Sequence, residues 1–405
     1  MEVLSKERFA ETVGAATVGG VNAVIEEWLG KPLPRLCKGV PPCPQARPSF
    51  RLPPPEPLPP YPLLVISPPA CLKHNIPGHF ERPARLTAIL HALHPPSRLP
   101  SLPPPHSPPS LPPSAFLLSD ADCPRATHEQ LARFHTTQHL AHLASLFAES
   151  QTLAATSQVQ EPSHLDPSSS PHLFPSYPPA SLIDIDGDTT VCPGTEEATL
   201  RAAGAACRGV EEVMEGRAES VWCLVRPPGH HATPSQSMGF CFVNHAGVAA
   251  MHARARYGVR RVAVLDPDVH HGNGTQDGFR DDPDLFYAST HVGYGFYPGT
   301  GSRKDAKGRE DRLVNVPFRE GEGSSEKFRQ AWAEEIFPKL RKFQPELIIL
   351  SMGFDAVAED PLGEMELRPE DFEWFSREVR RVGGRKGGRE GGREGCEGGV
   401  EYWRE

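Results

Sequence analysis

The chain has 405 residues and a formal net charge of −9 at pH 7, with 42 Lys and Arg against 51 Asp and Glu. This balance argues against a protein that binds nucleic acid through a basic surface of its own. The nine cysteines form no CxxC pair, which argues against a Cys-based zinc finger and a small disulfide scaffold. No run reaches the ~18 apolar residues of a spanning helix. We therefore expect an intracellular protein, in the nucleus, the cytoplasm or an organelle, without membrane or sequence-specific nucleic-acid partners.

Four regions of the chain differ in composition. Residues 1–30 carry apolar side chains at loosely helical spacing, which predicts an N-terminal helical segment. Residues 31–60 are rich in proline and predict an extended linker. Residues 61–382 have the patterning of a folded domain. Residues 383–405 are so dense in Gly, Arg and Glu that they predict a low-complexity tail.

Short apolar runs alternate with helical patterns in the predicted domain, apart from a proline-rich insert at 95–113 and a surface loop expected at 151–180. Thr127 and Gln130 fit a capping box that opens a helix, and Thr195 is expected to cap another. The alternation is typical of βαβ units, so we predict an α/β fold with a central, mostly parallel sheet flanked by helices. The predicted strands are 61–67, 220–225, 261–266, 285–290 and 347–352, and the predicted helices are 82–93, 196–215, 244–256 and 324–342.

Polar side chains and glycines follow four of the predicted strands. The segments are RPPGHH (226–231), PDVHHGNGTQ (267–276), HVGYGFYPGTG (291–301) and GFDAVAEDPLG (353–363). In open parallel sheets, functional groups gather at the carboxyl ends of the strands. We therefore expect these segments to form one site.

Asp268, His270 and Asp355 form the strongest constellation among these segments. Because side chains alternate along an extended segment, Asp-x-His directs two ligands to the same side. Asp355, from another strand end, supplies a third ligand. Three nitrogen and oxygen ligands with an open fourth position are typical of a catalytic zinc site, so we predict one Zn²⁺ per chain.

His230 and His231 follow a stiff Pro-Pro-Gly turn. A water molecule activated by a metal needs a base, and a leaving amine needs an acid. Histidine is suited to both tasks near neutral pH. His271 is expected to be structural, because a fourth protein ligand would close the metal site.

Together, RPPGHHATPSQSMGFCFVNHAG, VLDPDVHHGNGTQ, FYPGTG and SMGFDAVAEDPLG resemble the zinc-dependent histone deacetylase family. The likeness is nearest to the class II type and to bacterial acetylpolyamine-hydrolase relatives. KHNIPGHFERPARL (73–86) and RATHEQLARFH (125–135) resemble the family's N-terminal motifs. The resemblance implies a single α/β domain of the arginase/deacetylase type over about 61–380.

The resemblance also implies roles for individual residues. Asp268, His270 and Asp355 would hold the zinc ion, and His230 and His231 would be the base and acid. Other implied roles are spread over the same segments. Asp266 and Asn273 would orient the two histidines and make them differ in basicity; Gly239, Phe240 and Tyr297 would line an acyl-lysine tunnel; Asp188 would hold substrate backbone at the rim, unless it is only a loop-capping residue; and Asp266, Asp268, His270, Ser289 and Thr290 would bind a monovalent cation such as K⁺.

The implied reaction is hydrolysis of acetyl-lysine amides on histones or other proteins, in chromatin regulation and with corepressor-type partners. Acetylpolyamine or other small-molecule amide hydrolysis stays open, because the tunnel motifs do not distinguish a free amine chain from a peptide lysine. A catalytically weak scaffold that binds acyl-lysine is the third alternative. A binuclear manganese ureohydrolase is disfavoured, because Gly272 stands where a further Asp ligand is needed.

The chain departs from the family at its end. The family has a Tyr in a Leu-Glu-Gly-Gly-Tyr segment, which donates to the oxyanion and follows a central strand. Here the similar string is CEGGVEYWRE (396–405), with Val400 at the Tyr position and Tyr402 two residues later. We therefore expect a gap in the sheet and impaired turnover, either in a truncated or mis-spliced product or in a true short form that binds zinc and acyl-lysine.

Overall fold

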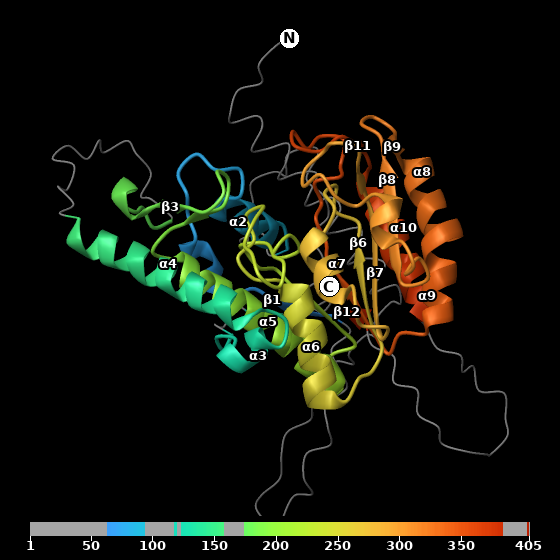
Figure 1. Ribbon diagram of the computed structural model, residues 1–405, viewed down its shortest axis with the longest axis horizontal. Coiled ribbons are helices and arrows are strands. Elements are labelled where there is room, and N and C mark those ends of the chain that lie inside the picture. Colours follow the sequence, from blue (N-terminus) through green and yellow to red (C-terminus); the bar gives the residue numbers. More distant parts are fainter. Residues whose placement is uncertain (1–62, 94–116, 120–122, 158–173, 384–402, 405) are drawn as a thin grey trace, which may run out of the picture.

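Figure 1 shows a computed structural model of the protein. The structure describes residues 63–93, 117–119, 123–157, 174–383 and 403–404. The predicted N-terminal helix, the linker, the proline-rich insert and most of the Gly-rich tail lie outside the described residues. No helix in the described part of the chain combines the length and apolar character that a bilayer crossing requires.

The core of the fold is an eight-stranded sheet in which every neighbouring pair is parallel, as the alternating pattern predicts. Its strands are apolar because helices cover both faces. In spatial order they are β2 (Leu117–Ser119), β1 (Leu64–Ile66), β5 (Ser220–Cys223), β12 (Trp403–Arg404), β10 (Leu347–Leu350), β6 (Val262–Asp266), β7 (Leu285–Val292) and β8 (Leu313–Phe318).

The centre of the sheet differs from the expectation of a gap. β12, only two residues long, lies between β5 and β10 and pairs in parallel with both. Trp403 lies beside Ser220 on one side and Ile348 on the other. The sheet is therefore continuous through Trp403–Arg404.

Two helical layers cover the sheet, and alternate residues of each strand point to opposite layers. Ala263 and Leu265 of β6 pack with one layer, and Val262 and Val264 pack with the other. Figure 1 shows α8, α9 and α10 on one side of β6 and β7, and α4, α5 and α6 on the other. The first contains α2 (Pro83–Leu93), α8 (Ser325–Gln330), the π-helical η4 (Ala331–Ile336), α9 (Phe337–Phe343) and α10 (Pro369–Gly383), and the second contains α3 (His128–Ala132), α4 (Thr137–Thr156), α5 (Thr195–Met214) and α6 (His245–Tyr257).

Shorter elements complete the domain and carry its loops. The first 3₁₀ helix precedes α2, and an antiparallel hairpin of two short strands precedes α5. They are η1 (Pro69–Lys73), η2 (Pro179–Ser181), η3 (Arg303–Ala306), β3 (Ile183–Asp184), β4 (Thr190–Val191), α7 (Asn273–Phe279), β9 (Gly323–Ser324) and β11 (Met365–Glu366).

Helix boundaries confirm one predicted cap and correct two other expectations. The capping box of Thr127 and Gln130 is present at the start of α3. The cap of α5 is Gly194, because the hydroxyl of Thr195 instead accepts the backbone N–H of Cys192 at 2.8 Å. The predicted loop at 151–180 is wrong over its first residues, since α4 continues to Thr156.

Candidate active site

The metal-site residues lie where β6 and β10 end. Leu265 of β6 pairs with Leu350 of β10, so the segments that follow the two strands start side by side. A Cβ atom at Gly353 would lie 1.8 Å from Oδ2 of Asp268. Glycine at 353 therefore allows the segment after β10 to bring Asp355 close to Asp268.

Asp268, His270 and Asp355 come together as the sequence predicts. Their ligand atoms all lie within 4.8 Å of one another, and no other such group occurs among the described residues. Nδ1 of His270 lies 3.1 Å from Oδ1 of Asp268 and 2.9 Å from Oδ2 of Asp355. Oδ1 of Asp355 also accepts the backbone N–H of Val269 at 3.0 Å. The three donor atoms thus face one point from two strand ends.

The electrostatics of this group favour a cation. Burial alone would lower the pKa of His270, but hydrogen bonds to Asp268 and Asp355 outweigh burial and raise the pKa to about 11. Burial opposes ionisation of Asp268, but His230 and His270 hold the pKa of this carboxyl below its usual range. Two carboxylates around one imidazole nitrogen suit a divalent ion that binds oxygen and nitrogen ligands.

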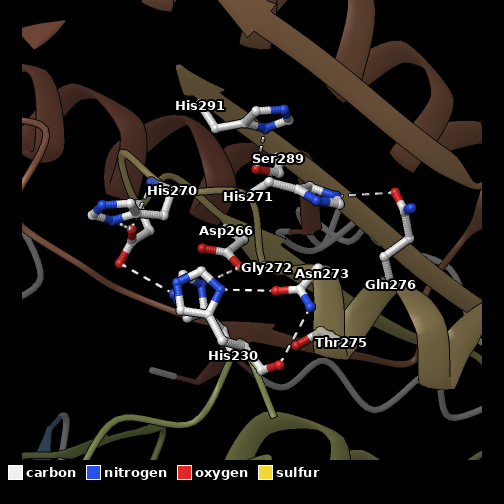
Figure 2. Close-up of polar contacts among 12 residues, drawn as sticks. His230, Asp266, His270, His271, Gly272, Asn273, Thr275, Gln276, Ser289 and His291 are labelled. Atoms are coloured by element: carbon white, nitrogen blue, oxygen red, sulfur yellow. Dashed lines mark hydrogen bonds and ion pairs between the residues drawn. The ribbon is translucent and has the colours of Figure 1, made fainter. Parts of the chain in front are cut away.

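His230 and His231 lie beside the metal-site residues, with ring centroids 4.0 Å apart. Nδ1 of His230 lies 3.1 Å from Oδ2 of Asp266, and Nδ1 of His231 lies 2.8 Å from Oδ1 of Asn273. Figure 2 shows Asp266 and Asn273 reaching toward this pair, with His270 next to it. Both oxygens are acceptors, so each histidine donates from Nδ1 and turns Nε2 away from its partner.

The two partners separate the basicities of the paired histidines. Burial lowers the pKa of His230, but the charges of Asp268 and Asp266 outweigh burial and raise the pKa to about 9. Burial and the neighbouring His230 lower the pKa of His231 well below its usual value. The carboxylate of Asp266 and the amide of Asn273 therefore accompany two imidazoles of different basicity.

Two of the residues predicted for the substrate tunnel, Gly239 and Tyr297, lie close to His231. The Tyr297 ring meets the His231 ring edge-on, with centroids 5.1 Å apart. A Cβ atom at Gly239 would lie 2.5 Å from the His231 ring and 2.8 Å from the Tyr297 hydroxyl oxygen. Phe240 has a left-handed backbone with φ of 68°. Gly239 and Tyr297 therefore pack directly against the His231 ring.

Asp188 is connected to Phe240 through Thr189. The hydroxyl of Thr189 accepts the backbone N–H of Phe240 at 3.0 Å and lies 3.3 Å from Oδ1 of Asp188. The Asp188 carbonyl lies 3.2 Å from Nε2 of His79. Burial and the charge of Asp186 raise the pKa of Asp188.

One of the residues predicted for a monovalent cation, Asp266, has a buried oxygen without a hydrogen-bond partner. Oδ1 of Asp266 is buried and makes no hydrogen bond. Asp266 pairs with Ser289 across β6 and β7, and the Ser289 hydroxyl lies 2.8 Å from Nδ1 of His291. The Thr290 hydroxyl accepts from the indole N–H of Trp332 at 3.1 Å, which leaves this hydroxyl engaged.

Other residues that support the site escaped prediction. The Tyr287 hydroxyl lies 3.2 Å from Oδ2 of Asp266 and accepts the backbone N–H of Gly272 at 2.9 Å. The Phe296 ring stacks on His270 with centroids 5.1 Å apart. Arg226 forms a buried ion pair with Glu81, which holds the start of the RPPGHH segment. No local sequence pattern indicated this last pair, because its members are 145 positions apart.

Comparisons with known proteins agree with this geometry. The histone deacetylase domain family matches residues 79–390. Histone deacetylase 14, chloroplastic, from Arabidopsis thaliana is 33% identical over 334 residues, which cover 80% of this chain and 70% of that protein. The histone deacetylase-like amidohydrolase of Pseudomonas aeruginosa is 41% identical over 201 residues, which cover 49% of this chain and 52% of that protein. This chain thus spans about half of the Pseudomonas relative.

A solved structure supports the same assignment. The crystal structure of the HDA15 HD domain has a TM-score of 0.64 and 27% sequence identity, and the match covers 84% of each chain. The predicted α/β fold of the arginase/deacetylase type is therefore confirmed. By family match, sequence identity and fold, the chain belongs to the histone deacetylase family.

Proposed function

We propose that the protein hydrolyses acetyl-lysine amides on histones or other proteins, with one zinc ion bound by Asp268, His270 and Asp355. The observation that carries this proposal is the convergence of three ligand atoms within 4.8 Å, beside two histidines with different partners. Family membership supports hydrolysis of an acyl amide.

The donor set fits zinc in kind and in number. Two carboxylates and one imidazole leave a further coordination position for water or substrate. When bound, the ion supplies Lewis-acid chemistry at the acyl carbonyl and makes water a stronger acid. The hydrogen bond from the Val269 backbone to Asp355 holds one carboxylate oxygen and leaves the other directed at His270.

In place of the base and acid roles that the resemblance implies for His230 and His231, respectively, we assign both proton transfers to His231. Its Nδ1–H donates to Asn273, so its Nε2 carries a lone pair that takes the proton of the attacking water. The water oxygen bonds to the acyl carbon, and the proton passes to the amine nitrogen as the C–N bond breaks. Acetate and a free amine result. His230, beside Asp266, favours the charged form and stabilises negative charge during the reaction.

Gly239, Phe240 and Tyr297 are the walls that we assign to the substrate chain. The methylenes of an acyl-lysine are apolar, and the aromatic faces of Phe240 and Tyr297 are suited to pack against them. We assign to Asp188, which Thr189 connects to Phe240, the role of accepting backbone N–H groups of a peptide. These contacts favour a substrate with a peptide backbone.

A monovalent cation, K⁺, is the second ion that we propose, close to Asp266 and Ser289. The buried and unpartnered Oδ1 of Asp266 supports this site, because such an oxygen is costly without a partner. The backbone oxygens of Asp268, His270 and Thr290 are the further ligands in this proposal. The positive ion would compensate the negative charge of the buried Asp266 carboxylate.

Turnover by this chain is proposed to be impaired. Val400 replaces the oxyanion-stabilising Tyr of the family motif, and Val400 and Tyr402 both lie outside the described residues. Loss of one such donor lowers rates by ~10²–10³. A zinc-loaded protein that binds acyl-lysine and turns it over slowly is the expected outcome.

The deciding experiment measures zinc content and turnover of the purified chain together. Acetyl-lysine peptide and acetylspermidine are offered separately, and His231→Ala is the matched variant. Zinc in both proteins, with turnover of the peptide lost in the variant, supports the proposal. Turnover of acetylspermidine alone indicates a polyamine hydrolase, and zinc with peptide binding but no turnover indicates a scaffold. Absence of zinc would refute the proposed site.

A further inference from the structure

The loop from Gly293 to Ser302 brings two aromatic rings to the proposed active site. It leaves the end of β7 and returns before η3. Phe296 stacks on His270 with an interplanar angle of 20°, and Tyr297 meets His231 edge-on. The position of this loop therefore determines how close Phe296 lies to His270 and how close Tyr297 lies to His231.

The far end of the loop is held by two buried histidines that the proposed reaction does not use. Nδ1 of His271 lies 2.8 Å from the Thr300 hydroxyl, and Nε2 of His291 lies 2.9 Å from the Gly301 carbonyl oxygen. The two rings are 4.8 Å apart and fully buried. Figure 2 shows His271 and His291 above Asp266 in this view, with His230 below it.

The hydrogen-bond partners fix the proton on His291. A backbone carbonyl only accepts, so Nε2 of His291 carries the hydrogen that reaches Gly301. Nδ1 of His291 then accepts the hydroxyl hydrogen of Ser289 at 2.8 Å. His291 is therefore neutral, with one donor and one acceptor both engaged.

The same reasoning fixes His271. The amide oxygen of Gln276 accepts from Asn315 at 2.7 Å and lies 3.2 Å from Nε2 of His271, so this nitrogen carries the hydrogen. Nδ1 of His271 then accepts the hydroxyl hydrogen of Thr300. The Thr300 hydroxyl therefore donates its hydrogen to His271, although Thr300 itself is exposed.

Close packing supports the same attachment. Gly301 has φ of 91°, and a Cβ atom there would lie 2.3 Å from Nε2 of His291 and 2.6 Å from Cγ of His271. The loop backbone therefore lies directly against both rings. Oδ2 of Asp305 accepts the backbone N–H groups of Gly301 and Ser302, each at 2.8 Å.

We propose that His271 and His291 are positioning residues that hold this loop and thereby set the affinity of the site for the acyl-lysine chain. The inference rests on the proposed function, because it assigns Phe296 and Tyr297 to the substrate approach. His271 acts through Thr300, and His291 acts through Gly301. Neither histidine touches substrate, so their loss affects binding of the chain more than the chemical step.

Two substitutions at Thr300 test this proposal without altering the core. Thr300→Val keeps the side-chain shape and removes the hydroxyl that donates to His271, whereas Thr300→Ser keeps a hydroxyl. For Thr300→Val we expect faster hydrogen–deuterium exchange over 296–301 and a roughly three- to tenfold higher KM for an acetyl-lysine peptide, the effect of losing one hydrogen bond. Zinc content and kcat stay within twofold of wild type, and Thr300→Ser restores KM.

The outcomes separate this inference from the proposed function. Unchanged exchange and unchanged KM in Thr300→Val overturn the inference, as does a fall in kcat at constant KM. Faster exchange with constant KM also overturns it, because the anchor is then only structural. If turnover is too slow to measure, the dissociation constant of the peptide replaces KM. A wild-type chain that binds neither zinc nor peptide refutes the proposed function instead.

Discussion

The carboxylate of Glu81 accepts two hydrogen bonds from Arg226, one from Nε at 2.8 Å and one from Nη2 at 2.6 Å, and both residues are buried. Arg226 also donates to the carbonyl oxygens of Cys71 and His74. Burial raises the pKa of Glu81, but the charge and hydrogen bonds of Arg226 outweigh burial and hold the pKa below its usual value. The pair joins the segment before α2 to the segment that carries His230.

Glu81→Gln should therefore destabilise the domain strongly. The variant leaves a buried guanidinium without its counter-charge, a change that typically costs about 3–5 kcal/mol. Urea denaturation measures the loss, and Glu129→Gln is the control because Glu129 pairs with Arg133 at an exposed position. Equal losses in both variants would contradict this account of Arg226.

The pH dependence of the wild-type pair has a defined sign. Because the pKa of Glu81 is lowered by folding, its contribution to stability is present above the unfolded pKa and is lost as pH falls through the folded pKa. Glu81→Gln should remove this part of the acid sensitivity.

A variant of Asn273 tests whether the hydrogen-bond partners of His230 and His231 make their pKa values differ. Asn273→Asp places a carboxylate at Nδ1 of His231 and should raise the pKa of this histidine by about 1–3 units. Because the neutral ring is the proton acceptor, the acid limb of the kcat/KM profile should move to higher pH. Asn273→Ala is the control, which lowers the rate without this shift. An acid limb that stays in place in Asn273→Asp would exclude His231 as the base.

Metal binding should depend on Asp355 and not on acids nearby. Asp355→Asn keeps an acceptor for the Val269 N–H but removes the charge, so zinc content should fall from about one per chain to near zero. Asp360→Asn is the control, because Asp360 lies outside the group of three ligands and accepts from Leu362. Metal analysis after dialysis measures both. Full zinc content in Asp355→Asn would contradict the ligand assignment.

The strand ends could be predicted because parallel strands end at one edge of a sheet. Asp268 and Asp355 are 87 positions apart, yet Leu265 pairs with Leu350 just before them. β8 escaped prediction because Pro317 interrupts its pattern, and a proline is tolerated there since β8 is an edge strand. Local pattern was therefore sufficient for β1, β5, β6, β7 and β10, but neither for the edge strand β8 nor for the two-residue central strand β12.

Contacts that depend on loop conformation were beyond the reach of sequence patterns. Phe296 stacks on His270 only because the loop after β7 returns to His271 and His291. Glu81 meets Arg226 across 145 positions, and nothing local to either residue indicates the pair. Apolar alternation locates strands, whereas long-range polar contacts follow from the completed fold.

Potassium should stabilise the domain through the buried oxygen of Asp266. We expect a higher Tm in KCl than in tetramethylammonium chloride at equal ionic strength, because only the small ion fits among oxygen ligands. Ser289→Ala should reduce the difference, since it removes one oxygen beside Asp266. Thr290→Val should keep it, because the Thr290 hydroxyl already accepts from Trp332. Equal Tm values in the two salts for the wild-type protein would exclude this site.

Buried neutral histidines should make the folded domain sensitive to acid. Burial lowers the pKa to about 4 for His74 and His245 and to about 3 for His135. The unfolded chain binds protons at these residues below about pH 6.5, whereas the folded chain resists them, so stability falls as pH drops through this window. Each such histidine should contribute on the order of 1 kcal/mol or more to this loss of unfolding free energy.

Urea denaturation at pH 7.5 and 5.5 measures this acid sensitivity, and His135→Gln isolates one residue. His135 donates from Nδ1 to the Thr233 carbonyl and accepts the Asn244 N–H at Nε2, and glutamine offers one donor and one acceptor that do not titrate. The variant should therefore lose less stability between the two pH values than wild type. An equal loss in both proteins would mean that His135 does not resist protonation in the folded state, because a titrating imidazole is the only property that the substitution is designed to remove.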